Sequence, residues 1–395
     1  MSETGPVVLV DGARTAIGTF GGSFKNTPAH ELGAAAIREA IARARVEHDE
    51  VDEVVLGCVG TVGPDAFNAR RAALAAGLAD QTTAMNVNRL CGSGLQALRS
   101  GAAEILTGEA SIVVAGGNEN MTRQPFLDYG ARDGYRLGDR ALVDGTLSLV
   151  TDPWGDYPMG CTAERVASKY HVTREEQDEF ALRSQQRAAA AIASGLFRDE
   201  IVPVTVRDHK VERIVDTDEH PRPDVTLEKL ARLRPAFAEQ GTVTAGNSSG
   251  INDAGAAIVL MRESTAQARG LQPLARFVAF SRAAIEPELM GYAPTYAIAS
   301  VLSKAEIGVE QLDVVELNEA FAAQAVAVIR DAKLDPEKVN RNGGAIALGH
   351  PIGATGAILT LKALYDLRRR DGQWALVSMC IGGGQAVAGL FEAVR

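Results

Sequence analysis

Cys91 is the residue whose setting best fits a catalytic nucleophile. It stands in the run Asn88–Gly94, between an expected strand and an amphipathic helix. Unpaired N–H groups and the positive dipole end at a helix N-terminus lower the pKa of a thiol and favour the thiolate. Gly92 and Gly94 allow another backbone or a substrate to approach closely. The alternative is a buried, inert cysteine, which is common in apolar chains.

His350 lies in the glycine-rich run Asn342–Gly356, ahead of an apolar helix. A histidine flanked by Gly349 and Pro351 has little core around it, so we interpret it as a general base that works near neutral pH. A structural histidine is the alternative. The other five histidines stand among polar or charged residues, and we expect them to be solvated: His30, His48, His171, His209 and His220.

A third reactive group, Cys380, is followed closely by the glycines at 382–384. Glycines at the end of a strand expose backbone N–H groups, and these can form an oxyanion hole. A tight hairpin between two final strands is an alternative that is compatible with this interpretation. The remaining cysteines, Cys58 and Cys161, have no base motif nearby, and we interpret them as structural.

Charge and composition exclude several classes of function. The 395 residues carry 40 Lys and Arg against 50 Asp and Glu, a formal net charge of −10, which excludes nucleic-acid binding through bulk positive charge. Four cysteines without a CxxC pair and only six histidines predict no metal site.

The glycine-rich runs contain neither a P-loop nor a GxGxxG motif with a following acidic residue, which argues against nucleotide hydrolysis and dinucleotide chemistry. Scattered cysteines, no signal peptide and no apolar run near ~20 residues predict a cytoplasmic protein without a membrane span.

The elements that would position these groups alternate between short apolar strands and helices, which predicts an α/β layered architecture. We expect strands at Val7–Val10, Val54–Leu56, Thr83–Val87 and Ile112–Ala115, and helices at Glu31–Ala44 and Leu95–Leu106. The C-terminal third repeats this order of strand, glycine-rich turn with helix, and strand. Val314 corresponds to Val54 at an offset of 260 residues, Thr355 to Ser93 at 262, and Leu376 to Val113 at 263. The near-constant offset favours duplication of one α/β unit. Chance matches between α/β segments are the alternative.

The segment of about residues 121–250 differs from both ends, because it is rich in Gly, Asp, Arg and Pro. One clear helix interrupts it, from Arg174 to about Ser194, and Thr173 with Glu176 forms a capping-box pattern at its start. Ordered loops of this length usually carry function or subunit contacts. We interpret the segment as a loop domain inserted before the first unit is complete, since strand character returns over Val243–Leu260.

Several motifs together resemble those of the thiolase family, in the family's order and over essentially the whole chain. They are Val10–Gly18, Asn88–Gly94, Thr244–Gly250, Asn318–Ala322, Gly349–Gly356 and Cys380–Gly384. The resemblance implies a five-layered αβαβα fold made of two duplicated halves, with an inserted loop domain. The expected boundaries are residues 1–120 plus 251–272 for the N-terminal half, 121–250 for the loop domain and 273–395 for the C-terminal half.

The resemblance also implies the reaction. Thiolases cleave a 3-ketoacyl-CoA with CoA, or condense two acyl-CoA molecules, with CoA as a substrate and no metal or permanently bound cofactor. By resemblance, Cys91 becomes acylated after His350 takes its proton, and Cys380 exchanges the proton at the α-carbon of the acetyl unit. His350 and a water held by Asn318 stabilise the enolate, while the N–H groups of Cys91 and Gly382 hold the tetrahedral oxyanion.

The resemblance places coenzyme A on the loop domain, where a net acidic chain needs a local cationic patch. Arg222 matches a family position near the nucleotide, and Lys229, Arg232 and Arg234 follow within the same thirteen residues. An ordinary solvated surface is the alternative for these last three. Ser249 matches a position that contacts the pantetheine arm. Further substrate contacts are expected in the matching motifs, at Ala245, Met159, Ala320 and Phe321.

Two departures from the family's pattern bear on the acyl group. Pro158 stands where short-chain biosynthetic members carry a histidine, and Ala293 replaces a glycine, so strict acetoacetyl specificity is not implied. We expect a homodimer or homotetramer, with acyl-CoA and CoA as partners and no nucleic acid. One alternative is a decarboxylating ketoacyl-synthase-type condensing enzyme, although that class generally carries a second histidine where Cys380 stands. The other is a non-catalytic acyl-CoA-binding protein.

Overall fold

The computed structural model describes residues 5–208 and 211–394, so His209 lies outside the described residues. The strands are β1 (Val7–Arg14), β2 (Gly18–Thr19), β3 (Glu53–Gly57), β4 (Thr83–Val87), β5 (Ile112–Asn120), β6 (Phe126–Leu127), β7 (Val143–Asp144), β8 (Thr151–Asp152), β9 (Tyr157–Pro158), β10 (Val204–Asp208), β11 (Val211–Val215), β12 (Asn252–Arg262), β13 (Ala275–Ala284), β14 (Val314–Leu317), β15 (Trp374–Ile381) and β16 (Gln385–Ala393). The α-helices are α1 (Ala29–Arg43), α2 (Asn68–Ala75), α3 (Ser93–Thr107), α4 (Gly145–Ser148), α5 (Gly160–Lys169), α6 (Arg174–Ala193), α7 (Leu227–Ala231), α8 (Glu263–Ala268), α9 (Pro294–Ala305), α10 (Ala322–Asp331), α11 (Ala345–Leu348) and α12 (Thr355–Arg369). Short 3₁₀ helices lie at Gly63–Phe67, Met121–Arg123, Ala131–Asp133, Leu196–Asp199, Pro287–Tyr292 and Val309–Gln311.

The pairing of the strands confirms the duplication. In the N-terminal half, β3 pairs in parallel with β5, β5 pairs antiparallel with β12, and β12 pairs antiparallel with β1. In the C-terminal half, β14, β15, β16 and β13 repeat these pairings in the same order and directions. The halves meet edge to edge where Val8 faces Arg276 and Leu9 faces Ala275. One continuous ladder therefore runs from β14 to β4.

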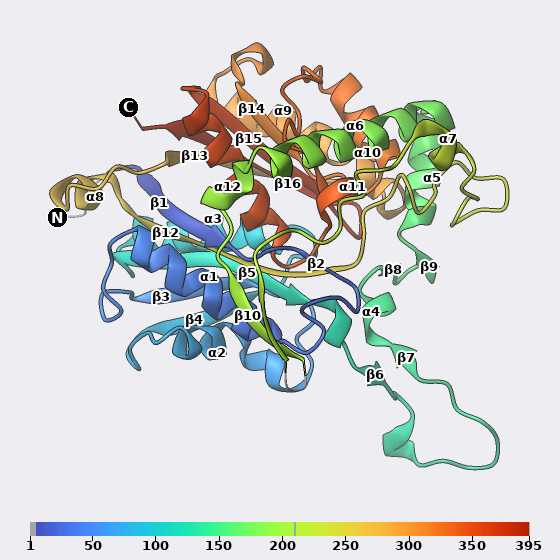
Figure 1. The fold of residues 1–395 in the computed structure, drawn as a ribbon, viewed down its shortest axis with the longest axis horizontal. Helices are drawn as coiled ribbons and strands as arrows, with labels where there is room; N and C mark the ends of the chain where they lie inside the picture. Colours follow the sequence, from blue (N-terminus) through green and yellow to red (C-terminus); the bar gives the residue numbers. More distant parts are fainter. Residues whose placement is uncertain (1–4, 209–210, 395) are drawn as a thin grey trace.

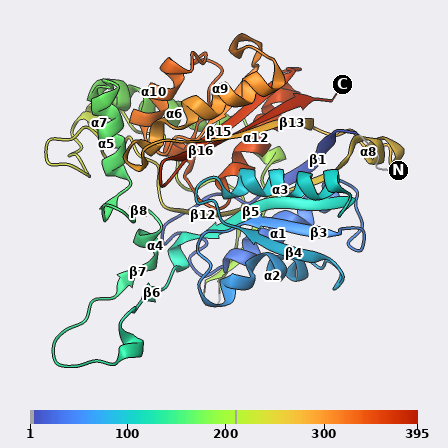
Figure 2. The ribbon, with the colours of Figure 1, turned by 180° about the vertical axis from the view of Figure 1, so that it is seen from behind.

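The strands and helices stack in the expected five layers, as Figures 1 and 2 show. Helices α1 and α2 cover the outer face of the N-terminal strands, and α9 and α10 cover the outer face of the C-terminal strands. Helices α3 and α12 pack against each other between the two sets of strands. Their buried side chains, such as Leu98 and Leu361, share one core cluster with Val113 of β5 and Val377 of β15. Because the central strands are covered on both faces, they form continuous apolar runs.

The predicted elements are present, with ends that differ by a few residues. Strand β1 runs on past Val10 to Arg14, and β5 runs on past Ala115 to Asn120. These extensions carry glycines and polar residues, such as Gly116 and Asn118, that an apolar pattern does not capture. Both extensions are buried, so they contribute to the core in spite of their composition.

Residues 121–250 are the least regular part of the chain, and Figure 1 shows β6 and β7 on an arm that projects from the body. Helix α6 begins with the predicted capping box, since Thr173 Oγ1 accepts from the Glu176 N–H at 3.2 Å and the Glu176 carboxylate accepts from the Thr173 N–H at 2.7 Å. The strand expected over Val243–Leu260 is wrong in its first part, because β12 begins at Asn252. Before it, the Asn247 side chain accepts from the Thr244 N–H at 2.8 Å and closes a loop.

Candidate active site

Cys91 lies in the sharp turn between β4 and α3, directly before the helix cap Gly92. The preceding residue, Leu90, has a left-handed backbone with a φ of 47°, which costs a non-glycine residue about 1–2 kcal/mol. Ser93 holds this turn, because its hydroxyl donates to Leu90 O at 2.6 Å and accepts from the Arg89 N–H at 2.9 Å. The turn therefore presents the Cys91 side chain in a fixed direction, outside the first turn of α3.

The prediction that the Cys91 thiol has a lowered pKa is wrong. Burial raises the pKa of the thiol to about 11, while the backbone N–H groups of Gly382 and of Cys91 itself oppose this rise and the Glu119 carboxylate adds to it. The loss of water around the sulfur outweighs the two N–H donors. The resting residue is therefore a thiol, and a thiolate forms only when a base takes its proton.

His350 lies on the turn between α11 and α12, and its side chain is buried. Its backbone N–H donates to Asn252 Oδ1 at 2.9 Å, which fastens the turn to β12 of the other half. The ring Nε2 lies 3.4 Å from Asn318 Nδ2. Burial lowers the pKa of His350 to about 4, so the imidazole is neutral at pH 7 and able to accept a proton.

Cys380 and Gly382 reach the same place from the end of β15. Ile381, which lies between them, packs against Gly92, the residue after Cys91, and the charge that Cys91 would carry adds to burial in raising the pKa of Cys380 above its usual range. Asn318 follows β14, and its N–H donates to a carbonyl of β15 at 2.9 Å. The structure thus brings Cys91 of the N-terminal half next to the end of β15, which carries Cys380 and Gly382, and it brings His350 next to Asn318.

Gln324 of α10 is a buried neighbour of Cys380 that sequence reasoning missed. Its Oε1 accepts from the Ala320 N–H at 3.0 Å and lies 3.9 Å from Cys380 Sγ. Within the described residues its Nε2 is buried without a hydrogen-bond partner. Gln324 thereby holds the loop before α10 beside Cys380. The sequence signal that identifies Gln324 is its position four residues after Ala320, because a side chain on a helix reaches back toward the residue four positions earlier.

Glu119, at the end of β5, is a second residue that sequence reasoning missed. Its buried carboxylate accepts N–H groups from Val59 at 2.9 Å, Gly60 at 3.0 Å and Gly353 at 3.0 Å. Burial raises the pKa of Glu119 to about 7, and the three N–H donors oppose that rise. One carboxylate thus ties the loop after β3 to the turn that carries His350.

The predicted pantetheine and acyl contacts lie in two loops that run side by side. The Ser249 N–H donates to Ala320 O at 3.0 Å, and the residue before Ser249 forms a bridge with Phe321. Met159 packs beside Ala320 and Cys380 in one small apolar cluster. These loops therefore form a wall that leads from Ser249 to the thiol of Cys380.

Gly382 packs closely against side chains of the neighbouring segments. A Cβ at this position would lie 3.0 Å from Met159 Cε and 3.5 Å from Leu90 Cδ1. A larger residue at 382 would therefore require the flexible end of the Met159 side chain to move by a few tenths of an ångström.

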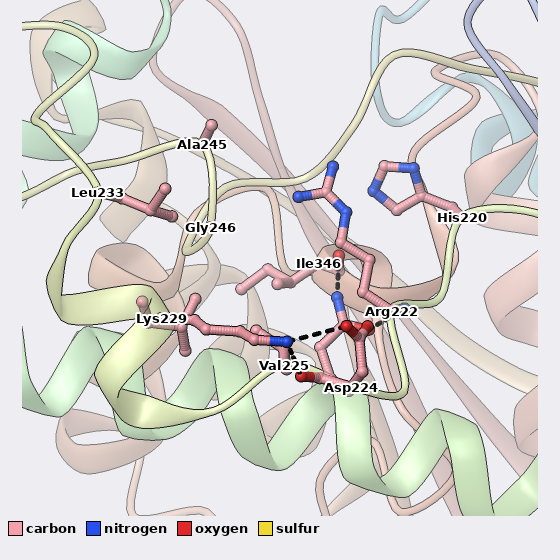
Figure 3. A pocket seen from close by; sticks show the side chains of 11 residues that line it. His220, Arg222, Asp224, Val225, Lys229, Leu233, Ala245, Gly246 and Ile346 are labelled. Carbon is pink, nitrogen blue, oxygen red and sulfur yellow. Dashed lines mark hydrogen bonds and ion pairs between the residues drawn. The ribbon is translucent and has the colours of Figure 1, made fainter.

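A cavity of about 220 Å³ lies beside these loops, mostly on residues of the segment 121–250 (Figure 3). The predicted residues Arg222, Lys229 and Ala245 line it, whereas Arg232 and Arg234 are exposed on the turn after α7. The full lining is Gln185, His220, Arg222, Asp224, Val225, Lys229, Leu230, Leu233, Ala245, Gly246 and Ile346.

The two cations that line the cavity have different surroundings. Lys229 Nζ is paired with Asp224 Oδ2 at 2.9 Å. Figure 3 shows the Arg222 guanidinium pointing away from that pair, toward the side where His220 and Ala245 lie. The expectation that His220 is solvated is wrong, because it lines the cavity and is half-buried. Burial and the neighbouring Arg222 lower the pKa of His220 to about 4, so Arg222 supplies the unneutralised positive charge of this wall.

Two other kinds of site are absent from residues 5–208 and 211–394. No group of three or more His, Cys, Asp or Glu side chains there is placed to hold a metal ion. No helix in this part of the chain is both long and apolar enough to cross a membrane.

Family comparisons cover almost the whole chain. Residues 7–264 match the thiolase N-terminal domain, and residues 271–393 match the thiolase C-terminal domain. A beta-ketothiolase BktB from Cupriavidus necator is 52% identical over 99% of this chain and 100% of its own length. An acetyl-CoA acetyltransferase from Rhizobium meliloti is 50% identical over 97% of each chain.

Solved structures agree with the sequence matches. The acetyl-CoA acetyltransferase of Bacillus anthracis superposes with a TM-score of 0.98, at 46% identity over 100% of both chains. The human mitochondrial 3-ketoacyl-CoA thiolase in complex with CoA superposes with a TM-score of 0.95, at 40% identity over 99% of this chain and 98% of that one. These matches support neither a ketoacyl-synthase-type enzyme nor a non-catalytic binding protein.

Proposed function

The chain belongs to the thiolase family and is an acyl-CoA:CoA C-acyltransferase, and we propose that Cys91 carries the acyl group between two half-reactions. One observation carries this proposal: residues of both duplicated halves lie next to Cys91. A Cβ on Gly92 would lie 2.5 Å from Ile381 Cδ1, and a Cβ on Gly382 would lie 3.5 Å from Leu90 Cδ1, so both neighbours of Cys91 contact the segment that follows Cys380. Simple binding of an acyl-CoA requires neither two thiols nor a base.

The first half-reaction is acyl transfer to Cys91. His350 Nε2 takes the thiol proton, the thiolate attacks the thioester carbonyl, and the Cys91 and Gly382 N–H groups hold the oxyanion. When the tetrahedral intermediate collapses, the bond to the CoA sulfur breaks and the imidazolium returns its proton to that sulfur. The products are acyl-Cys91 and free CoA. The raised pKa of the thiol and the lowered pKa of the imidazole keep both groups neutral until the substrate arrives.

The second half-reaction makes or breaks a carbon–carbon bond, and we assign its proton to Cys380. In condensation, the Cys380 thiol gives its proton to His350 Nε2, and the resulting thiolate removes a proton from the α-carbon of a second acyl-CoA. The carbanion attacks acyl-Cys91, and Cys91 leaves as a thiolate that takes the proton back from His350. In cleavage, the steps reverse and the Cys380 thiol protonates the departing α-carbon. With the Cys380 proton on Nε2, His350 donates to the enolate oxygen and stabilises it together with a water held by Asn318. The raised pKa of Cys380 keeps its resting form a thiol, which suits the cleavage direction.

Coenzyme A enters this scheme as substrate, and the scheme requires no metal or prosthetic group. We place its phosphates near Arg222, whose guanidinium forms no ion pair with a carboxylate of the described residues, with Lys229 and Ala245 beside it. The pantetheine arm then runs along Ser249, because that residue leads to Ala320 and Phe321. Met159 lies beside Cys380 and would contact the acyl group.

We also propose the assembly and the location. Residues 1–120 with 251–272 would form one half, 121–250 the loop domain and 273–395 the other half. Strand β4 ends the ladder with an open edge, and the projecting arm exposes Phe126, Tyr129 and Leu137. Both surfaces favour a homodimer or homotetramer. We propose the cytoplasm as the location of the protein. Sedimentation equilibrium of the purified protein measures the subunit number.

The proposal is tested by mapping the acyl adduct. The protein is incubated with acetyl-CoA, quenched in acid and digested, and an acetyl group is sought on the peptide that contains Cys91. We expect one acetyl group at Cys91 in the wild type and in the control Cys161→Ala, and none in Cys91→Ala. A wild-type protein without the adduct, or an adduct that survives in Cys91→Ala, contradicts the assignment.

A further inference from the structure

The two ring nitrogens of His350 have different polar neighbours. Nδ1 lies 2.7 Å from Thr355 Oγ1, and Nε2 lies 3.4 Å from Asn318 Nδ2. A neutral imidazole carries its proton on one nitrogen only, so these neighbours decide which nitrogen has a free lone pair. That choice determines whether His350 can act as a base on its Asn318 side.

Thr355 is in the first turn of α12, and its buried hydroxyl donates to Pro351 O at 2.9 Å. A threonine hydroxyl has a single proton, so this bond leaves only lone pairs for the histidine. The hydrogen on the Nδ1–Oγ1 contact must then come from Nδ1. The side chain of Thr355 is thus an acceptor that selects the Nδ1–H form.

The neighbour on the other side of the ring leads to the same form. The Asn318 amide places Nδ2, a donor, 3.4 Å from Nε2, and a donor at this side fits an Nε2 that carries no proton. Neutral histidine in water prefers the opposite form, with its proton on Nε2. The pocket therefore reverses the intrinsic preference.

We propose that Thr355 is a positioning residue that keeps the proton of neutral His350 on Nδ1 and leaves Nε2 unprotonated, so that Nε2 can take the Cys91 proton. This inference rests on the proposed roles of His350 and Cys91. When the S–H bond of Cys91 breaks and the Nε2–H bond forms, the ring becomes an imidazolium and Nδ1 still donates to Thr355. The ring keeps one orientation through the cycle, because the Nδ1 bond is the same before and after transfer.

The chain offers a matched control five residues further along α12. Thr360 is also buried, and its hydroxyl donates to Gly356 O at 2.7 Å, the same bond to the fourth preceding residue. Replacing either threonine by valine removes one such bond and keeps the side-chain shape. Only at Thr355 does the change also remove the acceptor of a histidine proton.

The experiment compares Thr355→Val, Thr355→Ser and Thr360→Val in two measurements. The first is the single-turnover rate of Cys91 acetylation. We expect Thr355→Val to lose about 10–100-fold, as for other partners that orient a functional histidine, and Thr355→Ser and Thr360→Val to remain near the wild type. An unchanged rate in Thr355→Val, or an equal loss in Thr360→Val, overturns the proposal.

The second measurement is the ¹⁵N spectrum of histidine-labelled protein at pH 7, assigned with a His350→Asn variant. We expect a protonated Nδ1 and an unprotonated Nε2 in the wild type, and a gain of the Nε2–H form in Thr355→Val. A wild-type ring with its proton on Nε2 overturns the role of Thr355, whatever the kinetics show. If the wild type forms no adduct, the proposed function fails, and the spectrum still decides the role of Thr355.

Discussion

Gly94 and Gly356 lie against each other where the N-termini of α3 and α12 cross. A Cβ on Gly94 would lie 2.7 Å from the Ala357 backbone nitrogen, and a Cβ on Gly356 would lie 2.2 Å from that of Leu95. The close approach of these two helices brings together the turns that precede them. The turn before α3 carries the thiol of Cys91 and the turn before α12 carries the imidazole of His350, so the two duplicated halves meet at the proposed active site.

Gly94→Ala is expected to damage the site more than the fold. Its Cβ meets backbone atoms that cannot move aside, which costs about 1–3 kcal/mol in overpacked cores and pushes α3 away from α12. Thermal unfolding and kcat are measured together. Gly101→Ala is the control, because it lies in the same helix but its Cβ meets the Val113 side chain. If both variants lose kcat equally at equal stability, helix crossing does not position the catalytic groups.

The resting thiol of Cys91 should react slowly with alkylating reagents at neutral pH. With its pKa near 11, the thiolate fraction rises about tenfold for each pH unit between 7 and 10. The alkylation rate by iodoacetamide should follow this rise, measured in Cys161→Ala to remove a half-buried competitor. A rate that is already level at pH 7 would show a preformed thiolate and would contradict the account.

Cys380→Ser should separate the two half-reactions. A serine hydroxyl is a much weaker acid than a thiol, so proton transfer at the α-carbon should fall by about 10²–10⁴-fold. The measurement is deuterium uptake into the methyl group of acetyl-CoA in D₂O. Acetylation of Cys91 should continue at a rate close to that of the wild type. Loss of both activities together would mean that Cys380 has no separate role.

Arg222→Ala should weaken the binding of CoA through its phosphates. Loss of a charge-assisted contact, about 1.5–3 kcal/mol, predicts a KM for CoA that is about tenfold higher or more. The KM for pantetheine, which lacks the nucleotide, should not change. Lys229→Ala serves as control and should have a smaller effect, since Asp224 already pairs with Lys229. Equal increases for CoA and pantetheine would refute the placement of the phosphates.

The sequence predicts the framework of the fold because buried strands and amphipathic helices leave periodic patterns. The offset between Val54 and Val314 links equivalent strands, since Val54 pairs in parallel with Val114 of β5 and Val314 pairs in parallel with Ala375 of β15. The start of β12 could not be predicted, because apolar and small residues before Asn252 have strand character. There, the Asn247 side chain competes with strand pairing for backbone hydrogen bonds.

The site could be predicted in its residues more than in its electrostatics. The turn before α3 and its helix dipole were visible in the sequence, but the loss of water around Cys91 depends on β15 and β16. For example, Ile381 of β15 and Val387 of β16 lie against Gly92, although they are nearly 300 residues away from it in the sequence. The half-buried position of His220 likewise depends on packing against Gly250. Long-range packing of this kind has no local signal.

The central claim, that Cys91 alone carries the acyl group, is tested most directly by isotope exchange. Acetyl-CoA is mixed with isotopically labelled free CoA, and the appearance of labelled acetyl-CoA is followed with no other acceptor present. Wild type and Cys380→Ser should exchange the label at similar rates, and Cys91→Ala should not exchange it. Exchange that persists in Cys91→Ala, or that is lost in Cys380→Ser, would contradict the account.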